Sequence, residues 1–189
     1  MILTEGNEYS VVLDACVLVP MPLCDTLLRL AEGSSLYRPF WSDRILEEVG
    51  RALQEKLRHS EGQSQRRIRA MRYAFPEALV QLDPSLEESL GCIPDKDDRH
   101  VMACAIRCGA YAIVTSNTKD FPAGCLAQWD LVCQTPDDFL LHQFHLNADL
   151  VLEKLDNQGA AIGKERDYIL ERLRVLAPQF VALVEECNS

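Results

Sequence analysis

The chain has 189 residues, a formal net charge of −10 at pH 7 and 48% hydrophobic residues. That length fits one well-buried domain with a helical appendage, and the acidic balance argues against general nucleic-acid binding through a basic surface. No apolar run reaches the roughly 20 residues of a membrane-spanning helix. The first residues also lack the basic start and apolar core of a signal peptide. We therefore expect a cytoplasmic protein with no membrane partner.

The N-terminal part of the chain alternates between strand and helix patterns. In chain order we expect a strand at 9–19, a helix at 22–31, a strand at 36–41, a helix from Ser42 to about residue 53, a turn at 59–65 and a helix at 68–75. Ser42 is a good N-cap, and apolar residues at helical spacing follow it. Pro76 ends the last of these helices.

The same alternation continues to the C-terminus. We expect a helix at 101–108, a strand at 111–115, a strand at 130–134, a helix that opens at Thr135, and a final amphipathic helix at 166–184 that Pro178 breaks or kinks. Alternating strands and helices predict an α/β fold, a parallel twisted sheet flanked by helices. We assign residues 9–145 to this domain and residues 146–189 to a C-terminal helical extension. The leucines of the extension pack on the core or form a partner surface, and core packing is the preferred interpretation.

Eight cysteines are scattered along the chain, and no two form a Cys-x-x-Cys pair. Most lie in apolar runs, where a cysteine usually behaves as a small buried hydrophobic residue. We therefore expect neither disulfides nor a structural zinc site.

Two polar positions should share one rim of the sheet. Asp14 ends or nearly ends the first strand, and Thr115 to Asn117 leave the strand that begins at Tyr111. Ligands of parallel α/β sheets bind beyond the carboxyl ends of the strands. A carboxylate in an apolar strand is costly unless it is paired or bound to a metal ion. The alternative is that Asp14 caps the following helix.

Further acids have local alternatives of their own. Asp95 and Asp98 could form a helix-capping arrangement, Asn117 and Asp120 could serve only a turn, and Glu48 could be a solvated helix residue. Glu48 is chosen over Glu47 because it lies closer to the apolar stripe of its helix. A cluster of carboxylates repels itself unless a cation lies within it, which points to a hard divalent ion.

Taken together, these segments resemble the PIN-domain family, and specifically its VapC-like toxins. The matching segments are residues 12–18, 41–49, 94–105 and 113–122. The resemblance covers residues 10–140 and implies a three-layer α/β sandwich and a metal-dependent ribonuclease, often dimeric and often neutralised by a small antitoxin. Asn117 stands where the broader family usually has Asp. Cys16 stands where a small polar residue such as Asn is common.

The resemblance implies a Mg²⁺- or Mn²⁺-dependent endoribonuclease, the toxin of a type II toxin–antitoxin system, with an RNA substrate, an antitoxin partner and a homodimeric state. The expected catalytic residues are Asp14, Glu48, Asp98, Asn117 and Asp120, of which the first three hold metal and Thr115 and Asp95 give support. The expected RNA contacts are Arg99, Arg66, Arg67, Arg69 and Arg72, although the last four could also form an ordinary solvated helix face.

Two other functions remain open on the sequence. The first is a catalytically degenerate PIN-fold module that binds RNA or a partner without cutting, and Cys16 and Asn117 motivate it. The second is phosphatase-like chemistry on an aspartyl nucleophile. It is less favoured because Cys16 occupies the position where a second aspartate would be expected after the first strand.

Overall fold

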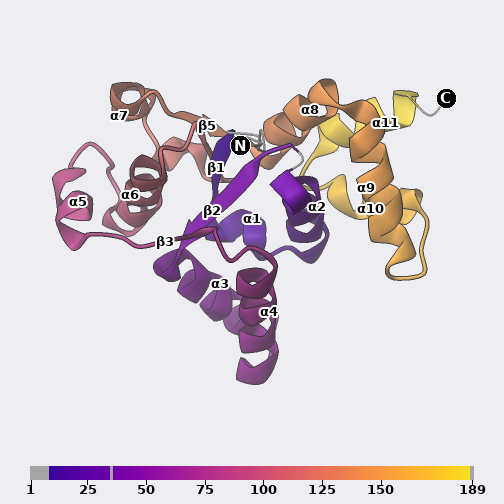
Figure 1. The fold of residues 1–189 in the computed structure, drawn as a ribbon, viewed down its shortest axis with the longest axis horizontal. Coiled ribbons are helices and arrows are strands. Elements are labelled where there is room, and N and C mark those ends of the chain that lie inside the picture. The colour runs from indigo at the N-terminus through magenta and orange to yellow at the C-terminus, as the bar shows by residue number, and fades with distance from the viewer. Residues whose placement is uncertain (1–8, 35, 188–189) are drawn as a thin grey trace, which may run out of the picture.

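A five-stranded parallel sheet runs through the middle of the molecule (Figure 1). The structure is a computed structural model that describes residues 9–34 and 36–187. The strands are β1 (Ser10–Leu13), β2 (Arg38–Ser42), β3 (Leu79–Val80), β4 (Ala112–Val114) and β5 (Val132–Gln134). Their order across the sheet is β3-β2-β1-β4-β5, and every neighbouring pair is parallel. The predicted parallel α/β fold is confirmed.

The two central strands form the core of the sheet. Val11 to Leu13 in β1 and Ala112 to Val114 in β4 are completely buried. Strands covered on both faces need apolar side chains at every position, which explains their continuous hydrophobic runs.

Helices cover both faces of the sheet and give the molecule three layers (Figure 1). Up to β5 they are α1 (Ala15–Leu18), α2 (Met21–Ala31), α3 (Asp43–Glu55), α4 (Glu61–Ala74), α5 (Pro84–Ser89), α6 (Arg99–Cys108) and α7 (Ala123–Leu126). Short 3-10 turns lie at η1 (Glu32–Ser34), η2 (Lys96–Asp98), η3 (Thr118–Asp120) and η4 (Ala127–Trp129). Helix α6 packs on β1, β2 and β4 and ends at Gly109, whose left-handed backbone (φ 62°) suits glycine.

The expected elements differ from the observed ones at several places in the first half of the chain, and two of these differences have a local cause. The first strand ends at Leu13 rather than continuing to Val19, because the Asp14 side chain accepts a hydrogen bond from the Ala15 backbone and starts α1. Helix α4 begins at Glu61 rather than after a turn, because Ser60 and Gln63 form a capping box.

Four C-terminal helices lie together beside α2, on the right of Figure 1. They are α8 (Pro136–Leu146), α9 (Ala148–Ala160), α10 (Arg166–Leu173) and α11 (Pro178–Cys187). Leu155, Leu170 and Leu173 are buried, so the preferred interpretation of core packing is correct. The expected last helix is broken into α10 and α11 before Pro178. Within the described residues, no helix combines the length and apolar character that crossing a bilayer requires.

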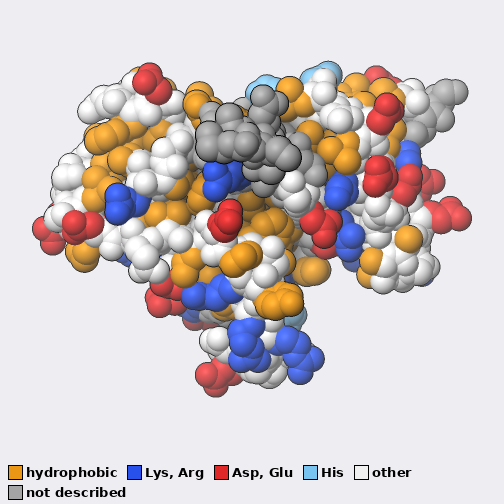
Figure 2. Space-filling model, in the orientation of Figure 1, with side chains coloured by type: hydrophobic (Ala, Val, Ile, Leu, Met, Phe, Trp, Pro, Cys, Tyr) orange, Lys and Arg blue, Asp and Glu red, His pale blue; other side chains and the backbone are white. Residues whose placement is uncertain are grey.

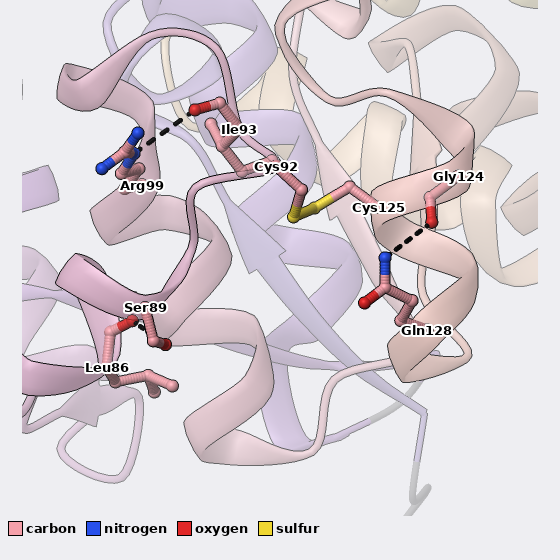
Figure 3. Close-up of a disulfide and its surroundings, with 8 residues drawn as sticks. All are labelled: Leu86, Ser89, Cys92, Ile93, Arg99, Gly124, Cys125 and Gln128. Carbon is pink, nitrogen blue, oxygen red and sulfur yellow. Dashed lines mark hydrogen bonds between the residues drawn. A yellow bond between two sulfur atoms is a disulfide. The ribbon is translucent and has the colours of Figure 1, made fainter.

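One disulfide joins Cys92, in the loop after α5, to Cys125 in α7 (Figure 3). The expectation that the chain forms no disulfide is therefore wrong for this pair. The partners are 33 residues apart, and only the fold brings their Cα atoms to 5.7 Å. The other six cysteines are free, and three of them are half-buried and two buried.

Candidate active site

Asp14 and Thr115 lie side by side at the carboxyl edge of the sheet. Leu13 of β1 is in register with Val114 of β4, so the next residue of each strand leaves the sheet at the same level. The chain continues from β1 toward β2 and from β4 toward β5, in opposite directions across the sheet. This is the kind of switch point at which ligands of open α/β folds bind.

The Asp14 carboxylate is 7% exposed and is held on both oxygens. Its Oδ1 accepts a hydrogen bond from the Ala15 backbone N at 2.6 Å, so Asp14 does cap α1. Its Oδ2 accepts a hydrogen bond from Thr115 Oγ1, also at 2.6 Å. Asp14 and Thr115 thus share one rim of the sheet, as the sequence predicts. Capping therefore accounts for only one of the two oxygens.

Cys16 adds a second donor to the same carboxylate. Its Sγ donates to Asp14 Oδ2 at 3.1 Å and accepts from the Ser116 backbone N at 3.2 Å. Burial, and then the charge of Asp14, raise the pKa of the Cys16 thiol to about 11. The thiol therefore keeps its proton at neutral pH and can donate. Asn117 is exposed, and its backbone N donates to Thr115 Oγ1 at 3.0 Å, so the Thr115 hydroxyl bonds both Asn117 and Asp14.

Asp98 brings further negative charge to this edge. It precedes α6 directly, but its side chain makes no capping hydrogen bond, whereas Asp95 caps η2 through the backbone N of Asp97. Burial and then the charges of Asp120, Asp14 and Asp95 raise the pKa of Asp98 to about 6. Capping thus explains Asp95 and leaves Asp98 without a structural task. The negative charges of Asp14 and Asp120 thus both act on Asp98.

Glu48 lies at the margin of this cluster. It is half-buried on α3, while Glu47 is exposed. Its Oε1 lies 3.0 Å from Nε2 of His100, an α6 residue that is 1% exposed. His100 also opposes the rise in the pKa of Asp98, so Glu48 reaches the cluster through this histidine.

His100 received no role from the sequence, although two signals were present. It follows Asp98 by two residues, and it lies on the helix face that also buries Val101 and Cys104. Its Nδ1 is buried and has no hydrogen-bond partner in the described part of the chain.

The donor set suits a hard divalent cation by its chemistry. The available atoms are carboxylate oxygens, which Mg²⁺ and Mn²⁺ prefer, and their mutual repulsion at Asp98 would be relieved by positive charge. As the side chains lie, no group of three His, Cys, Asp or Glu in residues 9–34 and 36–187 has metal-binding geometry. The residues therefore fit the ion in the kind of donor atom they offer, while their side chains as they lie do not form a ready site.

The candidate RNA-binding arginines fall into two groups. Arg66 and Arg69 are exposed on α4, and Lys and Arg side chains gather over α3 and α4 at the lower end of Figure 2. Arg67 instead donates to the backbone oxygens of Leu18 and Val19, at the end of α1. The guanidinium groups of the remaining two have partners as well: Arg72 pairs with Asp43, and Arg99 Nε donates to Ile93 O at 3.3 Å.

The protein is a parallel α/β protein with acidic side chains at the switch point of its sheet. Comparison with known proteins identifies its family. The family model described as "PIN domain" matches residues 10–119, more than half of the chain. The chain belongs to the PIN-domain family.

A shorter match links the chain to a curated relative. Over 49 residues it is 49% identical to a protein of Mycobacterium tuberculosis (strain ATCC 25618 / H37Rv) described as "Putative ribonuclease VapC50". The aligned stretch covers 26% of this chain and 29% of the relative.

Thr115→Val should loosen the Asp14 carboxylate without changing side-chain volume much. Thr115 is completely buried, and the valine removes the donor to Asp14 Oδ2 and the acceptor for the Asn117 backbone. We expect a loss of about 1–3 kcal/mol in the free energy of unfolding, measured by urea denaturation. Ser116→Ala, at an exposed neighbour, is the control and should lie within about 0.5 kcal/mol of wild type. Equal stability of the two variants would contradict the assigned bond.

Proposed function

We propose that this protein is a metal-dependent endoribonuclease, the toxin component of a type II toxin–antitoxin system. The observation that carries the proposal is the Asp14 carboxylate at the switch point of the sheet, held by Thr115, and the charges of Asp14 and Asp120 also act on Asp98. Membership of the PIN-domain family and the partial likeness to a protein described as a ribonuclease support it.

The proposed ligands of Mg²⁺ or Mn²⁺ are Asp14 and Asp98, with Glu48 holding the same ion or a second one. When bound, such an ion lowers the pKa of a water molecule and stabilises charge on a phosphate group. Thr115 and Cys16 restrict the rotation of the Asp14 carboxylate by donating to Oδ2.

The other polar residues have proposed roles in orientation. Asp120, near Asp98, can accept a proton or a hydrogen bond from the attacking water, and Asn117 is exposed where its amide can contact substrate. His100 orients Glu48 through the 3.0 Å contact. Asp95 fixes the start of η2 and so positions the backbone that carries Asp98.

RNA phosphates would meet a positive surface on an otherwise acidic protein. Arg66 and Arg69 on α4 are exposed and are the preferred phosphate contacts, with Arg99 and Arg72 as further candidates. Arg67 is already bonded to backbone oxygens, which gives it a structural role beside any role in binding. Because the chain belongs to the PIN-domain family, we also propose a small antitoxin partner and a homodimeric assembly.

Substituting the exposed arginines of α4 and substituting Arg67 should have different effects. The double variant Arg66→Ala/Arg69→Ala should keep wild-type stability, since both side chains are exposed. Loss of two phosphate contacts should reduce the slope of log affinity against log salt by about 1.4 for a single-stranded RNA. Fluorescence anisotropy over a KCl series measures that slope.

Arg67→Ala is the matched comparison on the same helix. It leaves the carbonyls of Leu18 and Val19 without their charged donor, so we expect a loss of about 1.5–3 kcal/mol in the free energy of unfolding. If the double variant binds RNA with the wild-type salt dependence, α4 is not the phosphate-binding surface.

The direct test of the proposed function is an RNA cleavage assay in Mn²⁺ with wild type, Asp14→Asn and Asp98→Asn. We expect cleavage by wild type, none in EDTA, and losses of about 100-fold or more in both variants, comparable to removal of a single transition-state contact. Equal activity of all three proteins would contradict the proposed function.

The second candidate is a PIN-fold module that binds RNA or a partner without cutting. It is favoured by the thiol of Cys16 and the amide of Asn117 in the site, and by the absence of ready metal geometry in the described residues. RNA binding without cleavage in any divalent metal would support this candidate over the first.

A further inference from the structure

The disulfide lies between the two segments that carry Asp98 and Asp120. Cys92 precedes Asp98 by six residues, and Cys125 follows Asp120 by five. Figure 3 shows Cys92 reaching across from the loop before α6 to Cys125 on α7. Along the chain, Cys92 and Cys125 therefore enclose the stretch that carries both Asp98 and Asp120.

Each of these two segments also packs on other elements. The turn η2 packs on α6, and Arg99 Nε on that helix donates to Ile93 O, next to Cys92. Helix α7 packs on η4 and β5. Asp98 and Asp120 carry like charges and oppose the approach of the two segments. The disulfide is a covalent link that acts against this repulsion.

We propose that Cys92–Cys125 is a redox switch: the oxidised pair holds the Asp98 loop against the Asp120 segment, and reduction opens that edge of the site. Cys92 is exposed and Cys125 is 3% exposed, so a reductant in solvent approaches the disulfide from the side of Cys92. If the switch also regulates RNA cleavage, that regulation rests on the proposed ribonuclease function. The opening of this edge on reduction does not depend on that function.

The reductant is a dithiol. Its thiolate attacks Sγ of Cys92, the bond to Cys125 breaks, and the Cys125 sulfur leaves as a thiolate that takes up a proton. The second thiol of the reductant then displaces Cys92 from the mixed disulfide. Two electrons and two protons pass to the protein, and the reductant ends as a disulfide.

The first part of the test needs no nuclease activity. Mass spectrometry after iodoacetamide labelling in denaturant should find six free thiols in protein purified in air without reductant. It should find eight after treatment with dithiothreitol. Amide hydrogen exchange at residues 92–99 and 118–126 should become about tenfold faster or more on reduction, as expected for released segments. The melting temperature should fall by about 5–15 °C, given the length of the closed loop.

Two variants assign the effect to this pair. Cys92→Ser should exchange like reduced wild type and not respond to dithiothreitol, whereas Cys187→Ser, at an exposed free cysteine, should respond as wild type does. Eight free thiols in the air-purified protein, or unchanged exchange on reduction, would overturn the switch. If Cys92→Ser does not fold, hydrogen exchange of wild type treated with dithiothreitol tests the same point.

The second part compares RNA cleavage in Mn²⁺ by oxidised and reduced wild type. We expect the reduced form to be slower by about tenfold or more, because misplaced catalytic groups are costly. If reduction speeds up hydrogen exchange but both forms cleave RNA at the same rate, the disulfide does not regulate cleavage. If neither form cuts RNA, the proposed ribonuclease function fails, while hydrogen exchange still decides whether the edge opens.

Discussion

Asp98→Asn is expected to make the metal-free protein more stable and at the same time to remove its RNA cleavage. The carboxyl of Asp98 makes no capping bond, and the negative charges of Asp120, Asp14 and Asp95 act on it. Asparagine removes that repulsion at nearly the same volume, so the melting temperature in EDTA should rise. The same change removes a proposed metal ligand, and cleavage in Mn²⁺ should fall by about 100-fold or more.

The stability gain should depend on pH in a defined window. Burial, followed by the neighbouring charges, raises the pKa of Asp98 in the folded protein to about 6 from an ordinary value of 3.8. Because the folded state favours the protonated form, wild type loses stability relative to Asp98→Asn as pH rises from about 4 to 6. The difference in melting temperature should therefore be small near pH 4 and fully developed above pH 7.

Glu47→Gln is the matched control, since it removes an exposed carboxylate from the same protein. It should change neither the melting temperature nor the cleavage rate appreciably. An Asp98→Asn variant that is less stable than wild type at pH 7 would show that Asp98 has a structural partner after all.

Asp137→Ala should give the largest loss of stability away from the site. Asp137 is 7% exposed in the first turn of α8, and it caps α11 from outside that helix. Its oxygens accept from the backbone N of Phe180 at 2.8 Å and of Gln179 at 3.1 Å. Alanine leaves these backbone donors without their acceptor, so we expect a loss of about 2–3 kcal/mol in the free energy of unfolding, measured in urea.

Asp149→Ala provides the comparison for this prediction. Asp149 is also an acid in the first turn of a helix, α9, but it is exposed. Its loss should cost no more than about 0.5 kcal/mol. Equal destabilisation by the two changes would mean that the contact between α8 and α11 contributes little to holding the C-terminal helices.

The sequence predicts the sheet and its rim well because both depend on local patterns. Continuous apolar runs mark the central strands β1 and β4, and Ser42 marks the start of α3 through its bond from the Ile45 backbone. Parallel strands end at one edge, which is enough to place Asp14 beside Thr115.

The remainder depends on contacts between distant segments. Cys92 and Cys125 meet only because the loop before α6 and helix α7 converge, and the spacing of cysteines along the chain does not record this. The contact of His100 with Glu48 likewise joins α6 to α3. Short elements such as β3 are set by their neighbours rather than by their own pattern, so no strand was expected at Leu79–Val80.

Calorimetric titration with Mn²⁺ tests most directly whether Asp14 and Asp98 form a divalent-cation site. Wild type should show saturable binding, and Asp14→Asn and Asp98→Asn should each weaken it by about tenfold or more, while Glu47→Gln binds as wild type does. Wild type that shows no saturable binding, or variants that bind Mn²⁺ as well as wild type, would show that Asp14 and Asp98 do not form a cation site.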